Sequence, residues 1–353
     1  MVPILVASNT GYAGRTFLSI GLALKLLDMG YKVGMMKPFG TVPVKAGKDV
    51  YDADAPFVKE TLGLEEPLDV ISPFVMSYEE QTLLLQGKIA DAKKRVLAAY
   101  KSIKKKDFVI LCGASDLIEG SLLGIDAVSL AEEINAKVLL VEPWRGDLSA
   151  DTLFGARAIF GKRYIGGVFN KVPEATMEFA KNTVKPFLDK KGVAVFGVIP
   201  KDKFLGSVTV GQLNEILNGI VLCSDDKLDE FVENFLIGAM DVDSALNYFR
   251  RIPNKAVITG AHRSDIQLAA LETSTKCIIL TGGFQTNEVV LGKARARGIP
   301  ILSVPSDTFS AIEKIELRMG ETSIREKRKV TRVKELIGTG FDMFGFLKKL
   351  DKV

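Results

Sequence analysis

Six short apolar runs, each separated from the next by a longer stretch with helical periodicity, constrain the fold of the first two hundred residues. They are PILVAS (3–8), KVGMMKP (32–38), FVILCGAS (108–115), AKVLLVEPW (136–144), YIGGVFNKV (164–172) and VAVFGVIP (193–200). Continuous apolar strands that alternate with amphipathic helices are typical of a parallel sheet covered on both faces. The sequence therefore predicts an α/β, doubly wound, mostly parallel fold.

The pattern of apolar runs and helical stretches changes after IPKDKFLGS (199–207), where a second α/β unit begins. A chain of 353 residues is longer than one hydrophobic core usually serves, so two domains are expected. In the second unit we expect strands within 219–224, 255–265, 276–283 and 299–307, and helices at 226–237, 265–272, 286–297 and 307–318. The expected division is 1–203 for the first domain, 204–335 for the second and 336–353 for a carboxy-terminal helical tail.

Composition excludes several classes of protein. Lys and Arg total 47 against 43 Asp and Glu, and the two basic runs, 101–107 and 325–334, contain no interleaved aromatic residues. Such runs are usually solvated faces, so we expect no nucleic-acid partner. No stretch reaches the roughly 18 apolar residues of a membrane span. Three widely separated cysteines and one histidine do not predict a zinc site. We therefore expect a cytoplasmic protein with reduced thiols and no membrane partner.

The segment SNTGYAGRT (8–16), between the first strand and the first helix, has the form of a phosphate-binding loop. In the pattern G-x-x-x-x-G-K-[ST], backbone N–H groups cradle phosphates, the lysine reaches the β and γ phosphates, and the hydroxyl holds Mg²⁺. Gly14 and Thr16 fit this pattern, whereas Asn9 replaces the first glycine and Arg15 replaces the lysine. The residues expected to contact phosphate here are Thr10, Gly11, Gly14, Arg15 and Thr16.

Arg15 makes the function of this loop an open question. Arginine binds phosphate through its planar fork, but it does not reproduce the point charge that follows a migrating phosphoryl group. Nucleotide binding without efficient phosphoryl transfer is one expectation. The alternative is a glycine-rich turn between strand and helix that binds nothing.

Gly14, Arg15 and Thr16, together with GYKVGMMKPFG (30–40), resemble the dethiobiotin synthetase branch of the P-loop proteins, with arginine in place of the loop lysine. More narrowly, the chain is similar to the dethiobiotin-synthetase-like amino-terminal region of bacterial phosphotransacetylases and of related stand-alone proteins, where a DRTGG domain follows. The second half resembles that domain in VTVGQLNEILNGIVL (208–222), VITGAHRSDIQLAALE (257–272) and the stretch 277–304. The acetyltransferase domain of phosphotransacetylases has no counterpart in this sequence.

The resemblance implies roles for several further residues. Asp54 matches a metal-side aspartate of the synthetases, although a helix N-terminal cap at Asp52 or Asp54 is an equal alternative. Cys112 stands where the family has an acidic Mg²⁺ ligand, and Asp116 could substitute only if its loop folds back. Lys37 matches a lysine that contacts substrate or phosphate; the alternative is a solvated strand end. Asn170 matches a residue that touches the purine, with a turn role as the alternative.

In the DRTGG-like half, the resemblance implies a ligand site or an interface. Its candidate residues are His262, Arg263, Asp265, Gly282 and Gly283. His262 stands where this family usually has an acidic residue, and a surface turn is its alternative role.

Taken together, these features favour a nucleotide-binding regulatory or sensor protein with a degenerate P-loop, using ATP or ADP and Mg²⁺. One alternative is an active ATP- and Mg²⁺-dependent ligase of the dethiobiotin synthetase type, and another is a scaffold that binds no nucleotide. Whether the chain is an enzyme or a pseudoenzyme stays open. The resemblance and a mean hydropathy of +0.18 also lead us to expect a homodimer.

Overall fold

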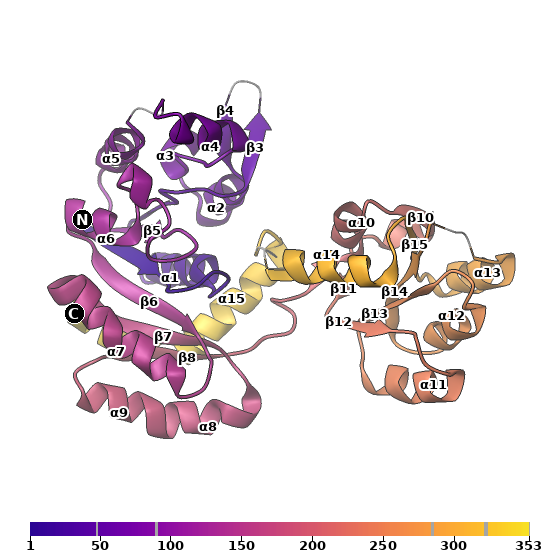
Figure 1. Cartoon of the computed structure of the whole chain (residues 1–353). Coiled ribbons are helices and arrows are strands. Elements are labelled where there is room, and N and C mark those ends of the chain that lie inside the picture. The colour runs from indigo at the N-terminus through magenta and orange to yellow at the C-terminus, as the bar shows by residue number, and fades with distance from the viewer. Residues whose placement is uncertain (47–48, 89–90, 284–285, 321–323, 353) are drawn as a thin grey trace. The chain divides into compact units, whose positions relative to one another are not determined.

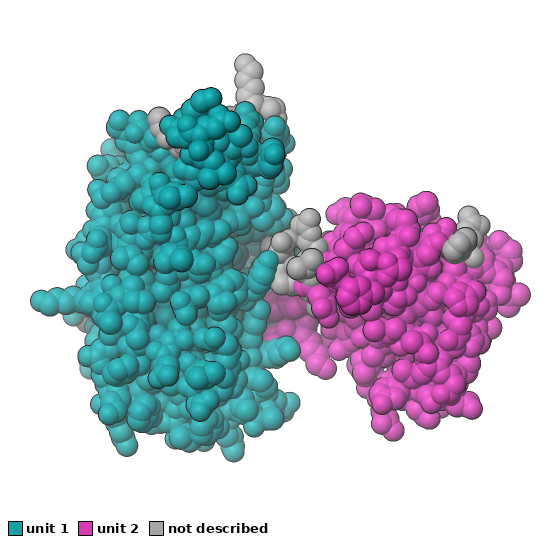
Figure 2. All heavy atoms as spheres, in the orientation of Figure 1, with its two compact units in different colours: residues 1–201, 323–353 teal, residues 202–322 magenta. Residues whose placement is uncertain are grey.

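The computed structural model describes residues 1–46, 49–88, 91–283, 286–320 and 324–352 (Figure 1). The chain divides into two compact units, which Figure 2 shows in different colours. Unit 1 is Met1–Lys201 together with Ser323–Val353, and unit 2 is Asp202–Thr322. In sequence, the second unit is therefore an insertion between the main part of unit 1 and its last helices.

Unit 1 is built on a six-stranded parallel sheet with the strand order β2-β5-β1-β6-β7-β8. The strands are β1 (Val2–Ala7), β2 (Val33–Met36), β5 (Phe108–Cys112), β6 (Lys137–Pro143), β7 (Tyr164–Val172) and β8 (Val195–Pro200). Each coincides with one of the six apolar runs, although β1 begins one residue before its run, and this confirms the predicted fold class. The chain leaves β1 toward β2 on one side and leaves β6 toward β7 on the other, so the carboxyl ends of β1 and β6 form a topological switch point.

Helices cover both faces of this sheet, and a small antiparallel hairpin of β3 (Pro43–Ala46) and β4 (Asp49–Asp52) follows β2. The helices are α1 (Arg15–Asp28), α2 (Asp54–Leu62), α3 (Leu68–Ile71), α4 (Tyr78–Leu85), α5 (Ala92–Ser102), α6 (Ala127–Glu133), α7 (Leu148–Phe160), α8 (Met177–Phe179), α9 (Lys185–Lys190), α15 (Lys327–Gly340) and α16 (Met343–Lys349). One face packs Leu5, Leu140 and Phe169 against Leu130 of α6 and Leu153 of α7. The other face carries α1, with α15 beside it (Figure 1).

The position of α15 differs from the expected division of the chain. Residues up to 335 were expected in the second domain, but helix Lys327–Gly340 belongs to unit 1. A Cβ atom added to Gly21 of α1 would lie 2.4 Å from Cγ1 of Ile337 and 3.0 Å from Cγ1 of Val333, so the two helices approach closely. The basic run 325–334 is thus not a uniformly solvated face, because it includes the fully buried Val333.

Unit 2 contains a five-stranded sheet with the order β10-β15-β14-β13-β12, parallel except for β10, and a separate pair of strands, β9 and β11. Its strands are β9 (Val208–Thr209), β10 (Ile220–Cys223), β11 (Phe231–Val232), β12 (Asn234–Ile237), β13 (Lys255–Gly260), β14 (Thr275–Thr281) and β15 (Ile301–Val304). Its helices are α10 (Val210–Leu217), α11 (Val242–Arg251), α12 (Ser264–Leu271), α13 (Glu288–Arg297) and α14 (Thr308–Gly320).

The helix expected at 226–237 is wrong. Residues Asn234–Ile237 form β12, which pairs with β13 at the edge of the sheet. The apolar spacing of this stretch also suits a helix, but pairing with a neighbouring strand overrides so weak a local preference. Among the helices described, none is both long and apolar enough to cross a membrane.

Candidate nucleotide-binding site

The loop between β1 and α1 leaves the first turn of α1 without a cap. Gly14 stands at the N-cap position with φ 101° and ψ 28°, and no side chain accepts a hydrogen bond from the helix start. In the described part of the chain, the backbone N–H groups of Gly14, Arg15 and Thr16 donate to no protein acceptor. N–H groups exposed in this way, at the positive end of a helix dipole, form a site for an anion.

Two residues at the end of β7 hold this loop from one side. Asn170 is buried, and its Nδ2 donates to the carbonyl oxygen of Ala13 at 2.8 Å. Lys171 donates from Nζ to the carbonyl oxygen of Tyr12 at 2.7 Å. A Cβ atom at Gly14 would lie 2.1 Å from Nδ2 of Asn170, so glycine is required there by space as well as by its positive φ. Asn170 was expected to contact the purine. In the structure its side-chain N–H binds the phosphate-binding loop.

Arg15 holds the loop from the other side. Its Nη1 donates to the carbonyl oxygens of Thr10 at 3.0 Å and Ser115 at 2.6 Å, and to Oγ of Ser8. Burial lowers the pKa of the guanidinium, although nearby acidic groups, including Glu119, oppose this shift. The guanidinium therefore joins the end of β1, the phosphate-binding loop and the segment after β5.

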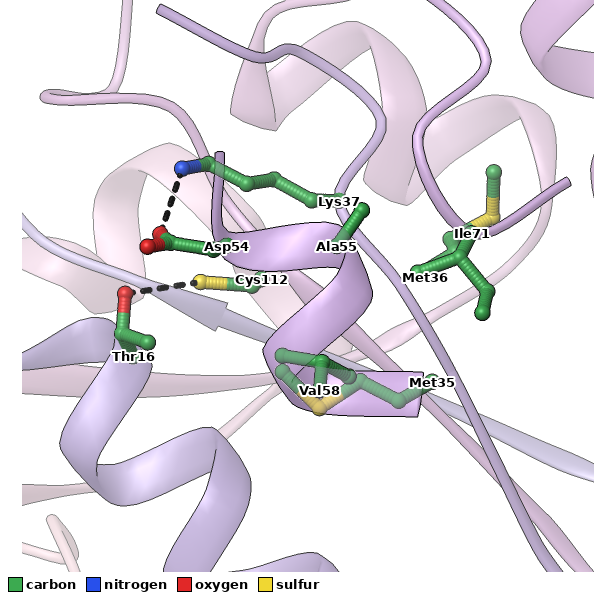
Figure 3. Close-up of a pocket in the computed structure, with 9 residues that line it drawn as sticks. All are labelled: Thr16, Met35, Met36, Lys37, Asp54, Ala55, Val58, Ile71 and Cys112. Carbon is green, nitrogen blue, oxygen red and sulfur yellow. Dashed lines mark hydrogen bonds and ion pairs between the residues drawn. The ribbon is translucent and has the colours of Figure 1, made fainter. Parts of the chain in front are cut away.

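Cys112 ends β5 and faces Thr16, with 3.9 Å between Sγ and Oγ1 (Figure 3). Asp116, the expected substitute for an acid at this position, accepts from the N–H groups of Ile118 and Glu119 at 2.9 and 2.8 Å. Glu119 in turn accepts from the N–H of Ser115 at 2.5 Å. Through these hydrogen bonds, Asp116 stabilises the turn that follows β5.

Asp54 takes part in a network of charged side chains on the other side of Cys112. Lys37, directly after β2, donates to Oδ1 of Asp52 and to Oδ2 of Asp54, both at 2.8 Å. Nε of Arg325 donates to Oδ1 of Asp54 at 2.8 Å. Oδ2 of Asp52 accepts from the N–H groups of Thr41 and Val42, which fixes this fully buried carboxylate.

Electrostatics favour the charged forms of Asp54 and Lys37 in this network. Burial alone would raise the pKa of Asp54, but Lys37 and Arg325 outweigh it and hold that pKa below its ordinary value. Burial likewise opposes the charge on Lys37, yet Asp54 and Asp52 raise its pKa. The sequence alternative of a solvated Lys37 is therefore wrong, because its side chain is only 15 % exposed.

A cavity of about 10 Å³ lies between these groups, lined by Thr16, Lys37, Asp54, Cys112 and apolar side chains (Figure 3). That volume is about what one water molecule needs. Of the three expected Mg²⁺ ligands, Thr16 and Asp54 line this cavity and Asp116 does not. No cluster of three His, Cys, Asp or Glu side chains suited to a metal occurs among the described residues.

The candidate residues of unit 2 lie at the carboxyl ends of the neighbouring strands β13 and β14. Arg263 pairs with Asp265 at 2.9 Å and donates to the carbonyl oxygen of Met240, while His262 is exposed. Gly282 and Gly283 have φ of 95° and 74°, and their N–H groups donate to the carbonyl oxygens of Ser306, after β15, and of Val304, at its end. The structure thus brings these five residues to one edge of the sheet.

Sequence reasoning missed several residues of the first site. Asp52 has a local signal, since it precedes Asp54 by two residues in YDADAP. Arg325 has none, because 271 residues separate it from Asp54. Lys171 and Glu119 form hydrogen bonds with backbone groups of loops, and the conformation of these loops cannot be predicted from the sequence.

A parallel sheet with an uncapped glycine loop between its first strand and first helix is the arrangement found in P-loop proteins. The chain belongs to the family described as AAA domain, whose model matches residues 3–209, and it carries a DRTGG domain matched over residues 212–317. These matches confirm the resemblance drawn from the sequence.

Similarity to individual proteins follows the same division. The chain is 25 % identical over 304 residues to a phosphate acetyltransferase of Synechocystis sp., covering 82 % of this chain and 43 % of that protein. It is 30 % identical over 169 residues to the ATP-dependent dethiobiotin synthetase BioD of Methanocaldococcus jannaschii, covering 40 % of this chain and 72 % of that one. The chain spans about half the length of the phosphate acetyltransferases that it matches.

Among solved structures, one match is the MinD cell division protein of Aquifex aeolicus. The match has a TM-score of 0.35 and 17 % identity, and it covers 58 % of this chain and 84 % of MinD.

Proposed function

We propose that this chain binds ATP or ADP at residues 8–16 and acts as a regulatory or sensor protein. The observation that carries the proposal is the uncapped start of α1, where backbone N–H groups converge beside Gly14. In such loops, backbone N–H donors make most of the hydrogen bonds to phosphates. Replacing the loop lysine therefore does not remove phosphate binding. The DRTGG domain in unit 2 would receive the regulatory signal.

The side chains around the loop favour binding over phosphoryl transfer. Transfer needs a mobile positive charge at the γ-phosphate and acidic groups that hold a metal. Arg15 is instead bonded to three oxygen atoms of the protein, and the end of β5 carries Cys112 in place of a carboxylate. Arg15 would thus stabilise the loop in its binding conformation.

The residues fit nucleotide phosphates better than they fit a Mg²⁺ ion held by carboxylates. Protein-bound Mg²⁺ usually takes one or two carboxylates together with phosphate oxygens and water. Thr16 could provide one oxygen, but both oxygens of Asp54 already accept from cations. On the base side, Asn170 could still offer Oδ1 to an adenine amino group while Nδ2 holds the loop.

Calorimetric titration with ADP and ATP, paired with an assay of phosphate release, tests this proposal. We expect measurable binding, negligible hydrolysis and a loss of affinity of about three- to tenfold in Thr16→Ala, the range for one hydrogen bond. Thr82→Ala, an exposed threonine on α4, is the matched control and should bind as wild type does. Absence of binding would leave a scaffold, and brisk turnover would show an active ligase.

Self-association is a second part of the proposal. Large apolar side chains are exposed on and near α7, among them Leu148, Phe154 and Ile159, and exposed apolar surface favours a protein partner. Two copies of the chain would cover it. Light scattering should give about twice the chain mass of 38.4 kDa, and a monomer at micromolar concentration would contradict this.

A further inference from the structure

Asp54 has a cation on each of its two oxygens. Lys37 donates to Oδ2 and Arg325 donates to Oδ1, each at 2.8 Å, and the carboxylate is only 9 % exposed. Lys37 comes from the end of β2, whereas Arg325 comes from the segment that re-enters unit 1 three residues after Thr322. Each oxygen keeps a second lone pair, but a metal ion bound there would lie beside a cation that already contacts the same oxygen.

Charged side chains beside the cavity already pair with one another. Among the described residues, the carboxylates of Asp52 and Asp54 pair with the cations Lys37 and Arg325. Like charges repel strongly at short range near a protein surface, so a divalent ion placed beside Lys37 would be repelled by its ammonium group. The cavity of about 10 Å³ also leaves little room for the water that Mg²⁺ retains.

We propose that Lys37, held by Asp52 and Asp54, serves in place of Mg²⁺ beside the nucleotide phosphates, and that Arg325 excludes the metal by occupying Asp54. An ammonium has three N–H donors, and within the described chain Lys37 uses two of them on the carboxylates. The third is available to a phosphate oxygen. This inference rests on the proposed nucleotide site, and it makes nucleotide binding independent of divalent cations.

Arg325 is not needed merely to hold its own segment in place. Lys327 pairs with Glu60 at 2.6 Å and Lys334 pairs with Asp28 at 3.3 Å in the same stretch of chain. Ile337 and Val333 anchor α15 on α1 by apolar contact. Replacing Arg325 should therefore free one oxygen of Asp54 while α15 stays docked.

The first experiment measures ADP affinity by calorimetry in excess Mg²⁺ and in EDTA. Wild type should show the same Kd in both conditions, within about threefold. Arg325→Gln should bind ADP about tenfold more tightly with Mg²⁺ than with EDTA, because Asp54 can then ligate the metal. Lys327→Gln, the matched control from the same segment, should behave as wild type. Strongly Mg²⁺-dependent binding by wild type, or an Arg325→Gln variant indifferent to Mg²⁺, overturns the inference.

A second measurement needs no nucleotide. Mn²⁺ occupies Mg²⁺ sites and can be counted by electron paramagnetic resonance, so free Mn²⁺ is titrated with each variant. Arg325→Gln should bind Mn²⁺ more tightly than wild type and Lys327→Gln, and Arg325→Gln combined with Asp54→Asn should lose that gain. Equal Mn²⁺ binding by all variants overturns the role of Arg325. If no variant binds ADP, the proposed function fails, while the Mn²⁺ titration still decides whether Arg325 blocks Asp54.

Discussion

The side-chain amide of Asn170 donates to the carbonyl oxygen of Ala13 across 2.8 Å and so ties the end of β7 to the phosphate-binding loop. This bond spans 157 residues of sequence and lies at the carboxyl edge of the sheet, near the switch point between the parallel strands β1 and β6. The conformation of the loop therefore depends on a strand two places away from β1.

Asn170→Ala should destabilise the protein and weaken ADP binding. Removing the amide leaves a buried carbonyl unsatisfied, which costs about 1–3 kcal/mol. Urea unfolding and ADP calorimetry measure the two effects. Asn182→Ala, an exposed asparagine on the helical segment after β7, should change neither. Unaltered ADP binding by Asn170→Ala would show that the loop keeps its shape unaided.

Gly14→Ala should abolish nucleotide binding, whereas Gly11→Ala in the same loop should retain it. Alanine at a left-handed φ costs roughly 1–2 kcal/mol. At Gly14 the added methyl would also lie 2.1 Å from Asn170, but at Gly11 it would meet no atom within 4 Å. Calorimetry on both variants is the measurement, with circular dichroism to confirm that each is folded. Equal loss of binding in both would mean that glycine at 14 has no special role.

Gly21→Val should lower the stability of unit 1, because its side chain would collide with Ile337 and Val333 of α15. Overpacking of this kind typically costs 1–3 kcal/mol, so we expect a loss of about that size in urea unfolding. Gly338→Ala, on α15 itself, meets no atom within 4 Å and should gain up to about 1 kcal/mol of helix propensity. A neutral Gly21→Val would show that α15 does not depend on close contact with α1.

Lys255 should make the stability of unit 2 rise in alkaline solution. Burial lowers the pKa of this lysine from 10.5 to about 8, so the folded chain releases a proton that the unfolded chain retains. Stability from this group is constant below pH 8 and increases between pH 8 and 10.5. Lys255→Met should flatten that increase in urea unfolding followed by circular dichroism. Lys227→Met, on the exposed surface of the same unit, should preserve it, and a wild-type curve without the increase would contradict the assignment.

The sequence predicted the sheet of unit 1 well because each strand is an apolar run long enough to be recognised alone. It also led to Gly14 and Thr16, since the phosphate-binding loop is a local pattern of contiguous residues. The docking of α15 was missed because Val333 and Ile337 stand among lysines and arginines, and only contact with the distant Gly21 shows which face is buried. β12 was missed because pairing with β13, not its own composition, decides its conformation.

The same limit applies to the site. Asp54 and Lys37 were candidates because each follows a recognisable element, but their mutual ion pair could not be derived from separate segments. The bonds from Arg15 to the carbonyl oxygens of Thr10 and Ser115 depend on loop conformation. A side chain that binds a backbone atom needs no particular type of residue as its partner. The sequence therefore contains no pattern that would reveal such a contact.

Because unit 2 is inserted before the last helices of unit 1, the order in which the ribosome makes the chain differs from the order in which the units become complete. Unit 2 has all its residues once Thr322 has been synthesised, whereas unit 1 lacks α15 until Gly340 emerges. Domains generally fold from the amino terminus during synthesis. Here the nascent first unit exposes the face of α1 around Gly21 through most of translation. We therefore expect a chain stalled before residue 324 to present a folded second unit and an incomplete, chaperone-dependent first one.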